Sequence, residues 1–513
     1  MKALSGLDGL FLHLETPETP MHVASLSLFE RPAGARGRFH TAVKRQIAQR
    51  LDRVPALTRR LAEMPLQFAN PVWVHDDAVD LDHHVQHRQL AAPGTLAQLE
   101  DLVATLHAEL LPRDRPLWRL VVIDGLDSGL VGYYMQVHHA VLDGMAGVQL
   151  AQALFDATPQ PPRGRRAASG QIKAANSPGE RPEAADAAEH PGAVALAAAA
   201  LRHDSAQVLK LLRQLPDLAR TLSGLLAGPG TGDWRQNLAF GPRTALNVPI
   251  GPARRFAGLS VPLDQLKALA RAHQAKLNDV VLSLTAGALR RWLAKHGGIP
   301  RKSLMAAMPV SLREAGNTEY TTQVTMTLVK LHSHIADPVR RLHAIRDASG
   351  AMKALTGRAR GLLPTDFPTI ASPWLMHGLA TVYGRSGLAR ALPPLANLVV
   401  SNVPGPPVPL YTAGARMVSY WPVSIVEHGV GLNLTVMSYA GALGFGFTAA
   451  RDAVPDARAF TQALQLELQA LASATAAMAA PPAVASALKT LPAPATRRAR
   501  RSPTPELLAE TIR

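Results

Sequence analysis

Most of this 513-residue chain alternates between strand-like and helix-like spacing of its apolar residues. Residues 131–137 are uncharged and rich in β-branched and aromatic side chains, which is typical of a buried strand, and residues 148–154 then begin a helical pattern. A further helix is predicted to start at 263–267. Another starts at Asn278, with four apolar side chains on one face, namely Val281, Leu284, Ala288 and Trp292.

Strand-like runs are concentrated in the last third of the chain. They lie at residues 303–310, 323–333, 396–402, 416–423, 430–439 and 441–449.

The chain length predicts two domains, because single hydrophobic cores stop growing at about 250 to 300 residues. We expect an N-terminal domain at residues 1–157 and a C-terminal domain at residues 245–480. Residues 158–244 are predicted to form a flexible linker and a helical connector between them. A basic tail at 481–513 is predicted to be disordered.

The connector and the tail are each open to two interpretations. Residues 158–192 have few large apolar side chains and are predicted to be the flexible part. Leucines recur at helical spacing over 201–225 with basic residues between them, so this amphipathic helix would pack on the protein or lie on a lipid surface. The four arginines at 497, 498, 500 and 501 would either be solvated or add about 1 kcal/mol each at an anionic leaflet.

The stretch from His138 to Gly144 carries the chemistry, because it places two imidazoles and a carboxylate at the end of the predicted strand 131–137. Histidine has an unperturbed pKa of about 6.5 and can take up and return a proton near neutral pH. Adjacent strand residues point to opposite faces, so His138 and His139 are expected to have different roles. Gly144 and Gly147 are expected to let the backbone turn sharply before the next helix.

Three other interpretations of this loop are weaker. Both histidines could be structural residues with hydrogen-bond partners, but the added Asp-Gly pair disfavours this. A metal site would need further ligands that no nearby spacing supplies. A Ser-His-Asp hydrolase would need a nucleophile elbow, and the chain has neither a G-x-S-x-G sequence nor a cysteine. A histidine base that acts directly on a substrate hydroxyl is the remaining interpretation.

The sequence H-H-x-x-x-D-G resembles the signature of the CoA-dependent acyltransferase superfamily, which includes chloramphenicol acetyltransferase-like enzymes and peptide-synthetase condensation domains. Other segments are similar to the bacterial wax ester synthase/acyl-CoA:diacylglycerol acyltransferase family. They are residues 4–12, 20–23, Pro116 to Trp118, Leu277 to Leu282, Ser401 to Pro406 and Gly431 to Val436, in that order.

The resemblance implies the α/β (α+β) fold class, with two chloramphenicol acetyltransferase-like domains that have mixed sheets, flanking helices and an active-site channel between them. It implies that His139 is the general base, with His138, Asp143 and Gly144 in supporting roles and Asp143 paired with an arginine. The expected reaction is direct transfer of a long-chain acyl group from acyl-CoA to a long-chain alcohol or a diacylglycerol. Acyl-CoA is then a co-substrate, and no bound cofactor or metal is expected.

The supporting segments have simpler interpretations too. Asn278 could be a helix N-cap followed by a favourably placed Asp279, or it could position substrate or stabilise an oxyanion. Pro116 to Trp118 is predicted to begin a strand and pack in the core, with a place in the pocket as the alternative. Ser401 to Pro406 is predicted to form a turn between strands.

Two rival functions stay open. A condensation-type enzyme would use the same loop on acyl groups bound to a carrier protein. A non-enzymatic lipid-body protein would use the connector and the tail to bind lipid.

The composition of the chain limits the cellular locations and binding partners that we expect for the protein. The absence of cysteine fits a reducing compartment, and Asp8, His13 and Glu15 interrupt any N-terminal signal-like run. No segment resembles a membrane span of about 20 apolar residues, so we expect a cytoplasmic protein with peripheral contact at the inner membrane or lipid inclusions. The net charge of the chain is +16, but its basic residues are not interleaved with aromatic residues as in a base-stacking surface. This favours a lipid surface and CoA phosphates over nucleic acid as the partners of the basic residues.

Overall fold

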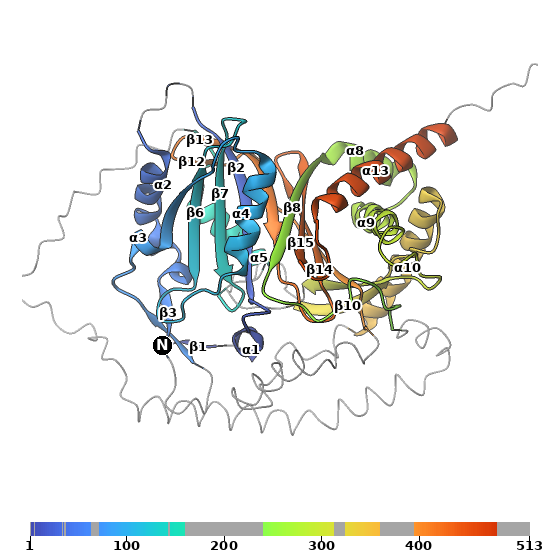
Figure 1. The fold of residues 1–513 in the computed structure, drawn as a ribbon, viewed down its shortest axis with the longest axis horizontal. Helices are drawn as coiled ribbons and strands as arrows, with labels where there is room; N and C mark the ends of the chain where they lie inside the picture. The colour runs from blue at the N-terminus through green and yellow to red at the C-terminus, as the bar shows by residue number, and fades with distance from the viewer. Residues whose placement is uncertain are drawn as a thin grey trace, which may run out of the picture.

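The computed structural model describes residues 2–479 of the chain, except for residues 5, 33, 35, 36, 63–70, 142, 143, 160–239, 312–323 and 360–393. The described residues form two six-stranded sheets that lie side by side, with helices around them, and a small three-stranded sheet (Figure 1). Both large sheets contain parallel and antiparallel pairs. The predicted α/β (α+β) class with mixed sheets is therefore confirmed.

The first large sheet contains the predicted strand 131–137. Its order is β12 (Tyr411–Thr412), β13 (Ala415–Val423), β2 (His22–Glu30), β7 (Val131–His138), β6 (Trp118–Asp124) and β5 (Val85–Gln89). The small sheet has the order β1 (Lys2–Ala3), β4 (Val72–His75) and β3 (Arg59–Ala62). The helices of this half are α1 (Gly6–Leu14), α2 (Phe39–Ala48), α3 (Leu81–His84), α4 (Leu96–Ala108) and α5 (Gly144–Leu154).

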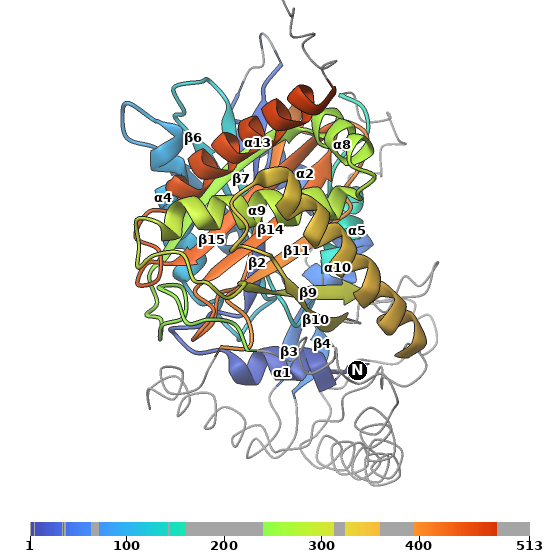
Figure 2. The same cartoon turned by 90° about the vertical axis from the view of Figure 1, so that its right-hand side faces the viewer.

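Helices cover the outer face of the second large sheet (Figure 2). Its order is β10 (Val324–Lys330), β9 (Met305–Ser311), β11 (Leu398–Val403), β14 (Leu432–Tyr439), β15 (Ala442–Ala450) and β8 (Arg254–Pro262). The covering helices are α8 (Leu263–Ala272), α9 (Leu277–Leu293), α10 (Pro338–Ala359) and α13 (Arg458–Ala479). A large apolar core lies between sheet and helices.

The predicted elements of the second half are confirmed. The six strand-like runs correspond to β9, β10, β11, β13, β14 and β15, and the two predicted helix starts correspond to α8 and α9. The four apolar residues predicted to share a face of α9 are all buried, although burial extends around most of that helix.

Two strands from the C-terminal part of the chain belong to the first large sheet. Strands β12 and β13 fall within the range 245–480, yet β13 pairs antiparallel with β2 in the first sheet (Figure 1). The chain thus crosses from the second sheet to the first and returns through β14. The domain boundaries drawn from the sequence stay a prediction.

Glycines on the second sheet allow β13 to lie directly against it. A Cβ atom added at Gly446 of β15 would lie 1.7 Å from the carbonyl oxygen of Pro422 in β13. A Cβ atom at Gly258 of β8 would lie 2.4 Å from the indole ring of Trp421, also in β13. Such close approach is possible only where the facing residue has no side chain.

Glu100 on α4 forms a second contact between the halves. Its carboxylate accepts a hydrogen bond of 2.9 Å from the backbone N–H of Gly258 in β8 and lies 3.6 Å from the guanidinium of Arg458 at the start of α13. Burial raises the pKa of Glu100 to about 7, and the lowering by the Gly258 N–H and by Arg458 offsets this only in part.

Replacing Glu100 with glutamine is expected to weaken the pH dependence of stability between pH 4.5 and 7. The folded-state pKa of about 7 exceeds the ordinary value of 4.5, so the folded protein retains in this window a proton that the unfolded chain releases. The parent's free energy of unfolding therefore falls by roughly 3 kcal/mol from this group as the pH rises. Glutamine never ionises and still accepts from Gly258, so the variant should avoid that loss.

Urea unfolding of parent and variant at a series of pH values measures this effect. The stability difference should shift in favour of Glu100→Gln as the pH rises from 4.5 to 7. A difference that stayed constant over this range would contradict the assignment to Glu100.

Several predicted segments lie outside the described residues. They are the linker from residue 160 onward, the amphipathic connector at 201–225 and the tail at 481–513. Within the part of the chain that the structure describes, no helix is both long enough and apolar enough to cross a membrane.

Candidate active site

The two histidines lie at the C-terminal end of β7, an interior strand of the first large sheet. All eight residues of β7 are buried, and the strand ends at His138 rather than continuing through His139. His139 is the first residue of the following turn and is partly exposed, whereas His138 is 1% exposed. The two imidazoles therefore have different surroundings, because one ends a strand and the other begins a turn.

The turn after β7 is made by hydrogen bonds to His138. The backbone N–H of Ala140 donates to His138 Nδ1 over 3.0 Å, and the N–H of Val141 donates to the His138 carbonyl oxygen over 2.9 Å. Gly144 is the first residue of α5, and Gly147 lies inside that helix. The expectation that Gly147 lies in a turn before the helix is wrong, because Gly147 is already helical.

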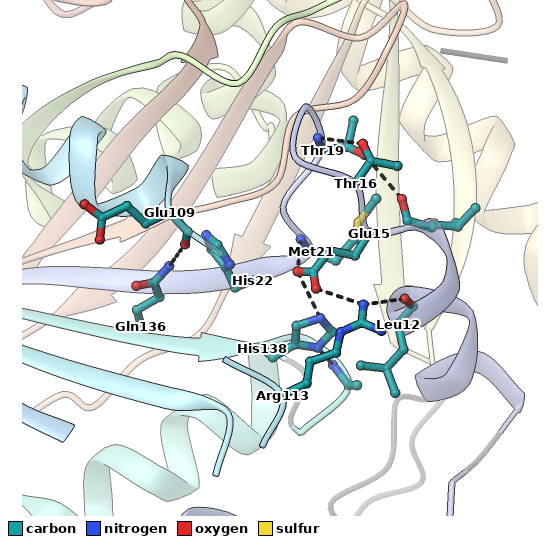
Figure 3. Close-up of polar contacts among 12 residues, drawn as sticks. Leu12, Glu15, Thr16, Thr19, Met21, His22, Glu109, Arg113, Gln136 and His138 are labelled. Atoms are coloured by element: carbon teal, nitrogen blue, oxygen red, sulfur yellow. Dashed lines mark hydrogen bonds and ion pairs between the residues drawn. The ribbon is translucent and has the colours of Figure 1, made fainter. Parts of the chain in front are cut away.

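His138 also contacts a buried carboxylate that the sequence analysis did not select. Glu15 is 4% exposed and lies between α1 and β2, with its Oε1 atom 3.3 Å from His138 Nε2 (Figure 3). The same Oε1 accepts a hydrogen bond of 3.1 Å from the N–H of Met21, and Oε2 accepts one of 3.0 Å from Arg113. Burial alone would raise the pKa of Glu15, but His138 and Arg113 lower it to about 2. Glu15 is therefore an anion at neutral pH.

Glu15 could have been found from its local sequence. Glu15 directly follows a predominantly apolar helix and precedes a short segment with two prolines, Pro17 and Pro20, which are typical of a turn. In the structure Thr16 and Thr19 close that turn with a hydrogen bond of 2.9 Å between their hydroxyl groups (Figure 3). The turn brings Met21 back beside Glu15.

His22 is a further buried imidazole in this region. It lies opposite His138 in the β2–β7 register, so the two side chains share a face of the sheet. Its Nε2 donates to the carbonyl oxygen of His107 over 2.7 Å. Burial lowers the pKa of His22 to about 4, although the bond to His107 opposes the shift. At neutral pH His22 is thus uncharged.

His139 is fixed by α1 and by the residue before His22. Its backbone N–H donates to the carbonyl oxygen of Met21 over 2.9 Å. Its imidazole stacks on the ring of Phe11 with 4.1 Å between centroids and 19° between planes. The ring of His139 is thus oriented by an aromatic contact while the residue keeps part of its surface accessible.

Pro116 to Trp118 supports the site from the core. Trp118 begins β6, is buried, and donates from Nε1 to the carbonyl oxygen of Leu57 over 2.9 Å. The carbonyl oxygen of Leu117 accepts from the N–H of His138 over 3.0 Å. The predicted strand start and core packing are therefore confirmed, and the segment also anchors the end of β7.

Asn278 does not cap its helix. The N-cap of α9 is Lys276, and Asn278 is already helical. Asp279 Oδ2 accepts a hydrogen bond of 2.9 Å from the Lys276 N–H, so the carboxylate one residue later satisfies the helix start. The N-cap expectation for Asn278 is wrong for this reason.

The side chain of Asn278 contacts another segment selected from the sequence. The Oδ1 atom of Asn278 accepts a long hydrogen bond of 3.4 Å from Asn402 Nδ2. Ser401 to Val403 are the end of β11 rather than part of a turn, and the loop begins only at Pro404. That loop docks on β14, where the N–H of Gly405 donates to Ser438 Oγ over 3.1 Å.

Asp143 lies outside the described residues, so its predicted arginine is not identified. Among the residues with described positions, no group of three or more histidine, aspartate or glutamate side chains is arranged to hold a metal ion.

Comparison with protein families gives matches along most of the chain. Residues 4–281 match the family described as "Wax ester synthase/diacylglycerol acyltransferase catalytic domain". Residues 321–472 match the family described as "WS/DGAT C-terminal domain".

Two relatives from Mycobacterium tuberculosis are similar over nearly their whole length. A putative diacylglycerol O-acyltransferase is 35% identical over 475 residues, which cover 91% of this chain and 99% of the relative. A probable diacylglycerol O-acyltransferase is 32% identical, with coverage of 91% and 98%.

Solved structures show the same fold. The wax ester synthase/diacylglycerol acyltransferase from Marinobacter aquaeolei VT8 superposes with a TM-score of 0.64 at 28% identity, covering 93% of this chain and 100% of that one. The first condensation domain of the calcium-dependent antibiotic synthetase gives a TM-score of 0.53 at 16% identity, with coverage of 92% and 96%. At that identity the likeness concerns the fold alone.

Proposed function

Because the chain belongs to the wax ester synthase/diacylglycerol acyltransferase family, we propose that it transfers a long-chain acyl group from acyl-CoA to a long-chain alcohol or a diacylglycerol, with His139 as the general base. The products are a wax ester or a triacylglycerol, together with free CoA. The enzyme is an acyltransferase, and acyl-CoA is its co-substrate.

The different surroundings of the two imidazoles support the choice of His139 as the base. The ring of His138 is buried, with Nδ1 accepting a hydrogen bond from Ala140 and Nε2 facing Glu15 at 3.3 Å. His139 is partly exposed; its backbone N–H donates to the Met21 carbonyl oxygen and its ring stacks on Phe11. A general base must reach the proton that it removes, and His139 meets this condition better than His138.

The proposed reaction is a direct transfer. His139 takes the proton of the acceptor hydroxyl as the hydroxyl oxygen attacks the thioester carbonyl carbon. The tetrahedral intermediate collapses with cleavage of the C–S bond, and the departing CoA thiolate recovers the proton from His139. The thioester is already activated, so the protein mainly aligns the hydroxyl, removes its proton and stabilises the oxyanion.

The remaining site assignments are part of the same proposal. Asn278 is the candidate for positioning substrate or stabilising the oxyanion, and its pairing with Asn402 supports a shared task for the two segments. Asp143 is proposed to brace the loop through an arginine, and Gly144 to allow a compact start of α5. The acyl-CoA and acceptor are proposed to meet in a channel between the two halves.

Peripheral attachment to the inner membrane or to lipid inclusions is proposed for the enzyme in the cytoplasm. The net charge of +16 and the arginine-rich tail at 481–513 support it. No bound cofactor or metal and no nucleic acid partner is part of the proposal.

Release of CoA thiol from palmitoyl-CoA tests the proposed function. We expect thiol release that depends on hexadecanol or dipalmitoylglycerol, with wax ester or triacylglycerol formed in equal molar amount. The matched control omits the acceptor. Transfer only from an acyl-carrier protein would instead indicate a condensation-type enzyme, and lipid binding without thiol release would indicate a lipid-body protein.

A further inference from the structure

Glu15 is a buried anion that the proposed chemistry does not use. Its two oxygens are divided among partners from different parts of the chain, with Oε1 facing Met21 and His138, and Oε2 bound to Arg113 (Figure 3). Burying a carboxylate is costly unless it is paired and hydrogen-bonded. Its position beside the histidine pair indicates a function for this charge.

The first consequence concerns the proton on His138. Because the N–H of Ala140 donates to His138 Nδ1, that nitrogen has to be unprotonated. A neutral His138 therefore carries its proton on Nε2, the nitrogen that faces Glu15 at 3.3 Å. The two atoms are close enough for electrostatic attraction, although their alignment is not that of a hydrogen bond. Ala140 and Glu15 thus favour the same tautomer from opposite sides of the ring.

The second consequence concerns the position of His139. Met21 donates its N–H to Glu15 and accepts the N–H of His139 on its carbonyl oxygen. One peptide segment therefore links the carboxylate to the backbone of the proposed base. Arg113 extends the link to α1, because it binds both Glu15 Oε2 and the carbonyl oxygen of Leu12. Leu12 follows Phe11, the residue whose ring stacks on His139.

From these contacts we infer that Glu15 is a positioning residue for acyl transfer, which holds His138 in its Nε2–H tautomer and, through Met21 and Arg113, fixes the backbone and ring of His139. The inference rests on the proposed role of His139 as base. By this inference the α1–β2 turn contributes to catalysis as well as to the fold.

Steady-state kinetics of Glu15→Gln test the positioning role in the full-length enzyme. We expect kcat to fall about tenfold or more, the scale seen when a partner that orients an active-site histidine is removed, while KM for palmitoyl-CoA changes less than about twofold. Glu18→Gln removes the same charge from the same turn and serves as the matched control, with kcat near that of the parent. Unchanged kcat in Glu15→Gln would overturn the inference.

A spectroscopic measurement on the parent protein keeps the test independent of whether the variant folds. Nitrogen-15 spectra of histidine-labelled protein, assigned with a His138→Gln variant, should show His138 as the neutral Nε2–H tautomer at pH 7. A protonated Nδ1 at His138 would contradict the inference. Failure of the base assignment itself gives a different result, because His139→Ala would then stay active.

Discussion

Replacing His139 with alanine is expected to lower kcat for CoA release by about 10²- to 10⁴-fold, the contribution of a general base. The fold should be unaffected, because His139 lies at the partly exposed start of a turn and alanine retains the backbone N–H that donates to Met21. Turnover with palmitoyl-CoA and hexadecanol measures the effect, and thermal unfolding measures the stability.

A matched histidine controls for nonspecific effects. His75 ends β4 with a side chain that is 62% exposed, and His75→Ala should keep the parent rate. Parent-level turnover in purified, folded His139→Ala would remove His139 from the proposed chemistry. In that event the tautomer at His138 would still be measurable, so the two proposals can fail separately.

Replacing Gly446 with alanine is expected to destabilise the protein by at least about 3 kcal/mol, at the upper end of the cost of overpacking. The added methyl would lie 1.7 Å from the Pro422 carbonyl oxygen and 2.8 Å from its carbonyl carbon. These are backbone atoms of β13, so they cannot rotate away as the end of a flexible side chain would. The crossover strand and the second sheet would have to separate, which should lower the urea midpoint and the yield of soluble protein.

Gly441 provides the comparison for this variant. It lies in the turn before β15 with a φ of +87°, and an added Cβ atom there meets no other atom within 4 Å. Gly441→Ala should therefore cost only the backbone strain of about 1 to 2 kcal/mol. Equal losses in the two variants would show that the close approach of β13 contributes nothing to stability.

The elements of this fold were largely predictable from the sequence, because each has a clear local pattern. The uncharged run 131–137 became β7, and the periodic apolar positions of 281–292 became the buried helix α9. The histidine motif and the family followed from residue identity and order. Local patterning determines which segments bury apolar surface, and that was sufficient for these features.

The expectations that proved wrong depended on which residues form particular hydrogen bonds, and not on the pattern of apolar residues. Gly147 was expected to lie in a turn before the helix, but it lies inside α5, and the turn at residues 138–141 is held by the hydrogen bonds that Ala140 and Val141 donate to His138. Asn278 was expected to cap α9, but Asp279 satisfies the Lys276 N–H. In both cases several residues could supply the bond, and the sequence alone does not rank them.

Sequence by itself determined the fold class, the strand that carries the histidines and the membership of the family. Tertiary structure decided which partners each histidine has. Glu15 and His138 are separated by more than a hundred residues, and β13 crosses into the first sheet from the far end of the chain. Such contacts depend on how strands pair across long loops, and neither apolar periodicity nor a local motif records that pairing.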